Sequence, residues 1–268
     1  MRFANMRIYT FSTTENITLS ILELENLYRN VYELWIFGYG SILWKPGFTY
    51  KSREVGMVKK YVRRFWQGNV THRGTPESPG RVATLIDDQQ VNYCFSELIR
   101  LKTLFKGEVW GMAFQLVGRT MIKKALHHLG VRECALGGYQ ATVVPFEGCG
   151  INGEKTQHNV LVFRASPENP YYMGPAPVKD MARQIIFCVG RTGHNVEYVT
   201  RLADFIRRHI PHDRDKHLFE LDYHLREILK QNQTWLDNVL RTTRKKESWH
   251  IRTLLDKQNK ISNMTVPN

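Results

Sequence analysis

The first 34 residues carry the hydrophobic spacing of one amphipathic helix. Residues 12–15 read Ser-Thr-Thr-Glu, which has the S-x-x-E form of an N-terminal capping box. Apolar side chains then recur mostly three or four positions apart, at Ile17, Ile21, Leu24, Leu27, Tyr28 and Val31. The pattern predicts a short helix within an N-terminal extension, residues 1–34.

Short apolar runs rich in β-branched residues replace this pattern further along the chain. The first run, residues 34–37, ends in a glycine-rich turn at 38–41, where we expect the compact domain to begin. Similar runs follow at residues 58–62, 82–86, 109–114, 141–146 and 159–164. Runs of this length bounded by Gly, Pro and polar residues are typical of strands, so a sheet is expected in the first two thirds of the chain.

Helical spacing dominates the last third. We expect helices over residues 178–189, stopped by Gly190; over 195–210, with Asn195 as the N-cap; and over 217–230. An earlier helix over 120–129 is expected to stop at Gly130, which would leave Glu133 in a connecting segment. Sheet first and helices last predict an α+β fold, not the regular βαβ alternation of a doubly wound one.

Two segments fit no regular element. Residues 89–105 form an apolar-rich insert between two expected strands, where a short turn would be usual. From residue 241 the chain is polar and basic. We therefore expect one domain over residues 35–222, with the insert at about 89–105, followed by residues 223–268, helical at first and then a tail.

Composition and charge narrow the class of protein. The chain has 268 residues, 42% of them hydrophobic and 24% charged, which excludes a disordered tether. Its net charge is +13, and between Arg241 and Lys260 seven Lys and Arg stand against Glu247 and Asp256. Much of the charge is thus peripheral, and the remainder suits the steering of a small anionic substrate. Nucleic acid is disfavoured as a partner unless the tail has a separate role.

Cysteine usage and hydropathy bear on location. The four cysteines form no CxxC pair, which favours neither a disulfide framework nor a thiolate zinc site: Cys94, Cys134, Cys149 and Cys188. No apolar run of about 18 residues occurs, and Glu15, Glu23 and Glu25 interrupt the stretch that a secretory signal would need. We expect a cytosolic protein without a membrane span.

Common catalytic motifs are missing. Gly38 and Gly40 follow an expected strand, but Leu43 stands where a dinucleotide-binding fingerprint would have its third glycine. The Walker, HExxH and GxSxG patterns and the paired Cys/His spacings of zinc modules are also absent. Resident metal or nucleotide cofactors are therefore disfavoured, and we expect none.

A histidine cluster near the last helices allows two interpretations. His209, His212 and His217 lie close in sequence to Asp213 and Asp215. These residue types can ligate a metal, but their position near a helix end favours a solvated polar face.

Arginine and aromatic residues are interleaved with glycines between residues 63 and 81. The residues concerned are Arg63, Arg64, Trp66, Gln67, His72, Arg73 and Arg81. Arginine binds carboxylates through two parallel hydrogen bonds, and glycine turns expose backbone N–H groups to anions. A basic loop of structural function, or a stacking platform for nucleic acid, would explain the same composition.

Six sequence blocks, in order from about Trp35 to Leu221, resemble the ChaC-type glutathione-specific γ-glutamylcyclotransferases. They are Trp35–Lys45, Arg63–Gly68, His72–Glu77, Pro79–Val82, Arg132-Glu133 with Gly137–Tyr139, and Tyr172–Pro177. The resemblance implies a small mixed β-barrel or sheet flanked by helices. It also implies a carbon-nitrogen lyase that cleaves glutathione to 5-oxoproline and cysteinylglycine, with no metal and no cofactor.

The same resemblance implies where the site lies. Glu133 occupies the family's catalytic position, where one carboxylate would act as base and then as acid. The family's substrate-binding loop corresponds to Ile36, Phe37, Gly38, Tyr39, Gly40 and Ser41. Arg73 is a candidate for contact with a substrate carboxylate, and Tyr172 is a candidate for a hydroxyl contact with the substrate. A structural role would explain either residue equally well.

The chain departs from the family pattern at several points. Ile42-Leu43 reverses the usual order, a near-isosteric change, and Thr71 replaces a common Asp, which puts an ionic contact there in doubt. The extensions and the insert have no counterpart in compact members, and the insert is either a real loop or a translated intron. Two alternatives stay open: a cyclotransferase for other γ-glutamyl compounds, and a basic binding module for nucleic acid or an acidic partner. The oligomeric state is not indicated.

Overall fold

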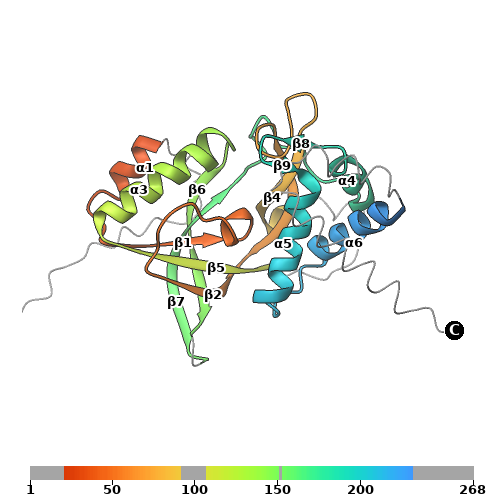
Figure 1. Cartoon of the computed structure of the whole chain (residues 1–268). Helices are drawn as coiled ribbons and strands as arrows, with labels where there is room; N and C mark the ends of the chain where they lie inside the picture. The colour runs from red at the N-terminus through yellow and green to blue at the C-terminus, as the bar shows by residue number, and fades with distance from the viewer. Residues whose placement is uncertain (1–20, 92–106, 151–152, 232–268) are drawn as a thin grey trace, which may run out of the picture.

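Five strands close into a small barrel at the centre of the molecule, in the order β1-β5-β2-β6-β7 (Figure 1). The computed structural model describes residues 21–91, 107–150 and 153–231. The barrel strands are β1 (Glu33–Gly38), β2 (Ser52–Lys59), β5 (Glu108–Val117), β6 (Gln140–Cys149) and β7 (Lys155–Arg164). The parallel pair β1–β7 closes the barrel, and the other neighbours are antiparallel.

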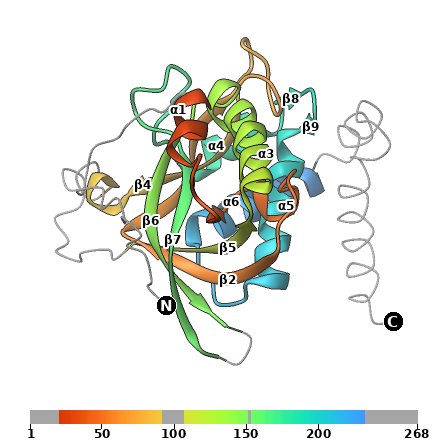
Figure 2. The same ribbon diagram turned by 90° about the vertical axis from the view of Figure 1, so that its left-hand side faces the viewer.

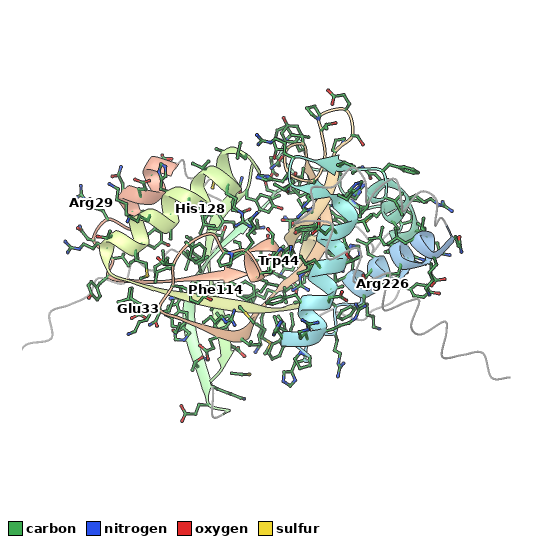
Figure 3. All side chains as sticks on the ribbon, in the orientation of Figure 1. Arg29, Glu33, Trp44, Phe114, His128 and Arg226 are labelled. Carbon is green, nitrogen blue, oxygen red and sulfur yellow. The ribbon has the colours of Figure 1, made fainter. Side chains whose placement is uncertain are left out.

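The C-terminal half of β1 is buried on both faces, because adjacent side chains of a strand point to opposite sides and both are covered here. Ile36 and Phe37 are fully buried, and Ile36 stands opposite Phe114 of β5 (labelled in Figure 3). The ring of Phe37 packs 5.7 Å from that of Phe146, which helps to fill the barrel interior. Trp35 instead stacks on His158 at 4.1 Å. The strand predicted at residues 34–37 is confirmed.

A separate two-stranded sheet, β3 (Tyr61–Asn69) with β4 (Gly80–Asp87), continues from the barrel. The run at 58–62, predicted as one strand, is divided between β2 and β3. Lys60 lies between them with φ of 68°, a left-handed conformation that redirects the chain. The other predicted strands are confirmed, and each strand is longer than the apolar run that predicted it.

Helices cover the barrel on two sides. Figure 1 shows α1 (Ile21–Leu27) and α3 (Arg119–Leu129) on one side, and Figure 2 is viewed from there. On the other side lie α4 (Val178–Ile185), α5 (Asn195–His209) and α6 (Lys216–Gln231). Leu24 of α1 is buried in the core, so this helix is packed against the barrel side and does not stand apart from it. The predicted α+β fold, a small barrel flanked by helices, is confirmed.

Three helix boundaries differ from the expectation. The helix before Glu133 does not stop at Gly130 but continues as a π-helical turn, η2 (Gly130–Ala135), because Gly130 keeps helical dihedral angles. The expected helix over 178–189 ends at Ile185. Asn195 is not the N-cap, which is His194; its side chain instead pairs with the Arg81 backbone in β4 (2.6 and 2.8 Å).

The segment between α5 and α6 is a solvated face only in part: His209 and His212 are exposed, but Asp213 is buried and Asp215 half-buried. Arg63, only 1% exposed, lies against it and donates Nη1 to carboxylate oxygens of Asp213 and Asp215, both at 3.0 Å. Its Nε donates to the Tyr39 carbonyl (3.0 Å), and Nη2 to that of Trp110 (2.7 Å). A buried arginine thus joins the ends of distant segments.

The remaining expectations concern residues that the structure does not describe. Residues 92–106, most of the expected insert, lie outside the described residues, as do the capping box at 12–15 and the basic tail. Within the described ranges, no helix has the length and apolar character needed to cross a membrane.

Replacing Arg63 by Met should destabilise the fold by about 3–5 kcal/mol, because Asp213 would stay buried without its partner. Burial already raises the pKa of Asp213, and Arg63 opposes that shift. A raised pKa in the folded state means stability falls as pH rises, so the deficit against wild type should be larger at pH 7 than near pH ~4. Urea unfolding of the variant and the wild type at both pH values measures this difference in the free energy of unfolding.

The matched control is Arg183→Met, which breaks the exposed ion pair with Asp180. That change should cost about 0.5 kcal/mol or less. Equal losses in the two variants would contradict the role assigned to Arg63.

Candidate active site

A cavity of about 580 Å³ opens beside the barrel, between η2 and α3 on one side and β4 and α5 on the other. Trp44, which follows the 3-10 turn η1 (Ser41–Leu43), and His128 of α3 both line it and are labelled in Figure 3. Its size is within the range of small-molecule pockets, which span roughly 300–1,000 Å³.

The end of β1 forms one wall. Tyr39, Gly40 and Ser41 line the cavity, and the Arg63 guanidinium holds the Tyr39 carbonyl. No acceptor within the described residues pairs with the N–H groups of Gly40 and Ser41. A side chain at residue 40 would begin 3.0 Å from the hydroxyl of Tyr198, so glycine permits this close approach. The turn therefore offers backbone donors to a bound anion.

Glu133 reaches the cavity from the π-helical turn. Its own carbonyl accepts from the Tyr139 N–H (2.9 Å), while the Leu136 N–H bonds five residues back to Val131 (3.1 Å). Such turns are rare and often occur at functional sites. The side chain is 15% exposed, and its Oε1 atom is buried.

The Glu133 carboxyl group is poorly satisfied. The Nε of Arg132 lies 2.9 Å from Oε1, yet no donor in the described part of the chain meets that oxygen with hydrogen-bonding geometry. Burial raises the pKa of Glu133 above its usual value, and the charge of Arg132 partly opposes the shift. A carboxylate in this state has an increased affinity for a proton.

Arg132 connects the two walls of the cavity. Its Nη2 donates to Oγ of Ser41 (2.7 Å), and its Nη1 to the carbonyls of Lys45 (2.6 Å) and Pro46 (3.2 Å). In the sequence, Arg132 is only the neighbour of Glu133 within one of the matched blocks. The bond to Ser41, 91 residues away, has no local sequence signal.

Tyrosines surround the carboxylate. The charge of Glu133 contributes to the raised pKa of each tyrosine that lines the cavity, namely Tyr39, Tyr139 and Tyr198. Burial is the main cause of all these shifts. All of them are thus close enough to interact with the carboxylate. The matched sequence blocks include Tyr39 and Tyr139 but not Tyr198.

The other predicted site residues divide into two groups. Arg73 lines the cavity, although its Nη1 donates to the His194 carbonyl (3.1 Å) and lies 3.4 Å from a carboxylate oxygen of Glu197. Tyr172 does not line it; its backbone bridges that of Gln67. Ile36, Phe37 and Gly38 also lie outside the lining, in the barrel wall. The cavity therefore brings together Glu133, Tyr39, Gly40, Ser41 and Arg73.

Positively charged and imidazole groups gather around the same cavity. The lining includes Lys45, Lys124, His72, His127 and His128. From the sequence, Lys45 and His72 are named only within matched blocks or the basic segment 63–81, and the other three are not named. Burial and the charge of Arg132 lower the pKa of His72 and of His128. In the described ranges, no group of three or more His, Cys, Asp or Glu side chains is arranged to hold a metal ion.

Comparison with known proteins gives consistent matches. The family model for ChaC-like proteins matches residues 34–228. Glutathione-specific γ-glutamylcyclotransferase 1 of Danio rerio is 45% identical over 70% of this chain and 87% of its own length. The Homo sapiens protein of the same name is 43% identical over 69% and 75%.

A solved structure supports the fold. The crystal structure of a γ-glutamyl cyclotransferase specific to glutathione from yeast aligns with a TM-score of 0.63 at 24% identity, covering 73% of this chain and 96% of that one. The family match spans the barrel strands, the cavity and the helices from α3 to most of α6, but not α1. The chain therefore belongs to the ChaC-like protein family, as its sequence blocks indicated.

Proposed function

We propose that this protein is a glutathione-specific γ-glutamylcyclotransferase that converts glutathione to 5-oxoproline and cysteinylglycine. The observation that carries the proposal is the largely buried carboxylate of Glu133, which faces a cavity of small-molecule size. Its Oε1 atom forms an ion pair with Arg132 but has no hydrogen-bond donor among the described residues. The names of the relatives from Danio rerio and Homo sapiens support the choice of glutathione.

The reaction needs no nucleophile from the protein. The α-amine of the γ-glutamyl unit attacks its own γ-carbonyl carbon and closes a five-membered ring. Holding the substrate in a bent, near-attack conformation can contribute on the order of 7–11 kcal/mol. The enclosed walls formed by η1, η2 and α5 are suited to that task.

Glu133 handles the proton in two steps. It first takes a proton from the substrate ammonium, so that the nitrogen lone pair can form the new C–N bond. The new ring nitrogen then carries one excess proton, which it releases to water. As the tetrahedral intermediate collapses, the bond to the cysteine nitrogen breaks and that nitrogen receives the proton from Glu133, which gives the lactam of 5-oxoproline and the free amine of cysteinylglycine. The raised pKa of Glu133 suits both roles, because it moves the carboxyl group toward the working pH.

The surrounding groups bind and orient the substrate. The free N–H groups of Gly40 and Ser41 suit the α-carboxylate of the γ-glutamyl unit. Arg132 positions this loop relative to Glu133, because it contacts Ser41 and the carboxylate together. Lys45 and Lys124 give the cavity a positive charge that attracts the anionic tripeptide.

The cytosol is the compartment that fits this activity. It is kept reducing by glutathione, which would be the substrate. Cys134, Cys149 and Cys188 are free thiols, in agreement with such a compartment.

Changing Glu133 to Gln should lower the release of 5-oxoproline from reduced glutathione by roughly 10²–10⁴-fold, because the proton acceptor is lost. The fold should survive. The pKa of Glu133 is raised in the folded protein, so its ionised form opposes folding at neutral pH, and the amide should match or exceed wild type in thermal stability there.

The matched control is Glu147→Gln, which alters an exposed carboxylate on β6 outside the cavity and should leave turnover unchanged. Both assays use purified protein without added metal or nucleotide. Unchanged turnover by the Glu133 variant would refute the catalytic assignment. Turnover of other γ-glutamyl amino acids, but not of glutathione, would favour the alternative substrates.

Arg132→Gln should move the acidic limb of the kcat/KM profile to higher pH. Arg132 lowers the pKa of Glu133, so its removal lets that pKa rise further. Since the base must be ionised, activity is lost as pH falls through this pKa, and the loss should begin at higher pH in the variant. Arg132→Lys keeps the charge and should shift the limb less. An unshifted limb in the Gln variant would contradict the coupling.

A further inference from the structure

We propose that Tyr198 is a second catalytic residue, which donates a hydrogen bond to the γ-carbonyl oxygen of the substrate and stabilises the oxyanion formed there. This inference rests on the proposed function, because it assigns a donor to that reaction. It follows from where the hydroxyl lies, from its hydrogen-bond partner and from the commitments of the other donors in the cavity.

Tyr198 presents its hydroxyl group to the part of the cavity where the reaction would occur. The residue belongs to α5, lines the cavity and is 5% exposed. Its Oη lies beside Gly40 of the proposed substrate-binding loop, 3.0 Å from where a side chain would begin. Trp44 packs 5.8 Å from its ring and Phe65 6.3 Å, so the ring is held in place.

The hydroxyl proton of Tyr198 is uncommitted within the described residues. Its oxygen accepts a hydrogen bond from the Ala83 N–H (3.1 Å), which fixes the oxygen but leaves the proton free. The other cavity tyrosines differ. The hydroxyl of Tyr39 donates to the Phe163 carbonyl (2.6 Å), and that of Tyr139 to the Ala83 carbonyl (2.8 Å).

The two arginines that line the cavity are already engaged. Arg73 interacts with Glu197 and with a main-chain carbonyl, and Arg132 with Ser41, Lys45 and Glu133. Among the cavity tyrosines and arginines, the Tyr198 hydroxyl, with its oxygen fixed and its proton without an acceptor in the described residues, is therefore the donor available to a developing negative charge. Preorganised donors of this kind are effective because they need little reorganisation during the reaction.

The electron flow is straightforward. When the α-amine attacks, the π electrons of the γ-carbonyl move onto its oxygen, and the Tyr198 O–H hydrogen bond strengthens without transfer of the proton. When the bond to the cysteine nitrogen breaks, these electrons re-form the carbonyl of 5-oxoproline. Burial raises the pKa of Tyr198 to about 12, so the hydroxyl stays protonated at neutral pH.

The first test is Tyr198→Phe, assayed with reduced glutathione. The kcat value should fall by about 10²-fold, and KM should change by less than about threefold, because the hydrogen bond strengthens only in the transition state. Wild-type turnover is measured alongside. If wild type is inactive, the proposed function itself fails; if wild type is active and the variant keeps its kcat, only this inference fails.

Tyr61→Phe is the matched control, because it removes a tyrosine hydroxyl from β3, which pairs with β4, and Tyr61 does not line the cavity. Both variants keep the aromatic ring, and Tyr61→Phe should keep kcat within a few-fold of wild type. Equal losses of kcat in the two would overturn the proposal, since a general loosening around β3 and β4 would then explain both.

A second substitution tests the proton itself. Replacing Tyr198 by 3,5-difluorotyrosine keeps the ring and the acceptor oxygen, so the fold should be preserved. The fluorine atoms lower the pKa of the phenol. The basic limb of the kcat profile should then move to lower pH, because the donor proton is lost sooner. An unmoved limb would overturn the proposal even if Tyr198→Phe did not fold.

Discussion

The buried guanidinium group of Arg63 is the contact on which the rest of the structure depends. It joins the end of β1 through the Tyr39 carbonyl, β5 through that of Trp110, and the α5–α6 connection through Asp213 and Asp215. A buried charge is stable only when it is fully paired, so these segments must meet in one arrangement. That arrangement sets the direction of the Tyr39–Ser41 loop and hence one wall of the cavity.

The opposite wall shows the reverse situation, a buried charge that is left partly unsatisfied. Burial raises the pKa of Glu133, and Arg132 meets it at one atom while binding Ser41 and Lys45 with others. The imperfect pairing opposes folding but leaves the carboxylate able to exchange a proton. The well-paired Arg63 thus stabilises the fold, whereas the poorly paired Glu133 is available for the proposed chemistry.

Sequence reasoning succeeded where an element depends on its own periodicity. The strand at 34–37 and the helix at 120–129 both occur, because a short apolar run and a helical spacing of apolar residues are local features of the sequence. It failed where distant partners decide the outcome. Asn195 has an N-cap composition, but its side chain serves the Arg81 backbone, and Asp213 and Asp215 have a surface composition but are partners of buried Arg63.

The sequence by itself determined the strands and helices, the family and the position of the candidate carboxylate, since these rest on local pattern and on residue blocks. Only the tertiary structure decided which members of the matched loop reach the cavity: Tyr39, Gly40 and Ser41 do, whereas Ile36 and Phe37 are buried in the barrel wall. It alone also placed Arg132 on Ser41 and left the Tyr198 proton without an acceptor among the described residues. The physical reason is that burial and hydrogen bonding at these groups depend on atoms about 90 to 115 residues away along the chain.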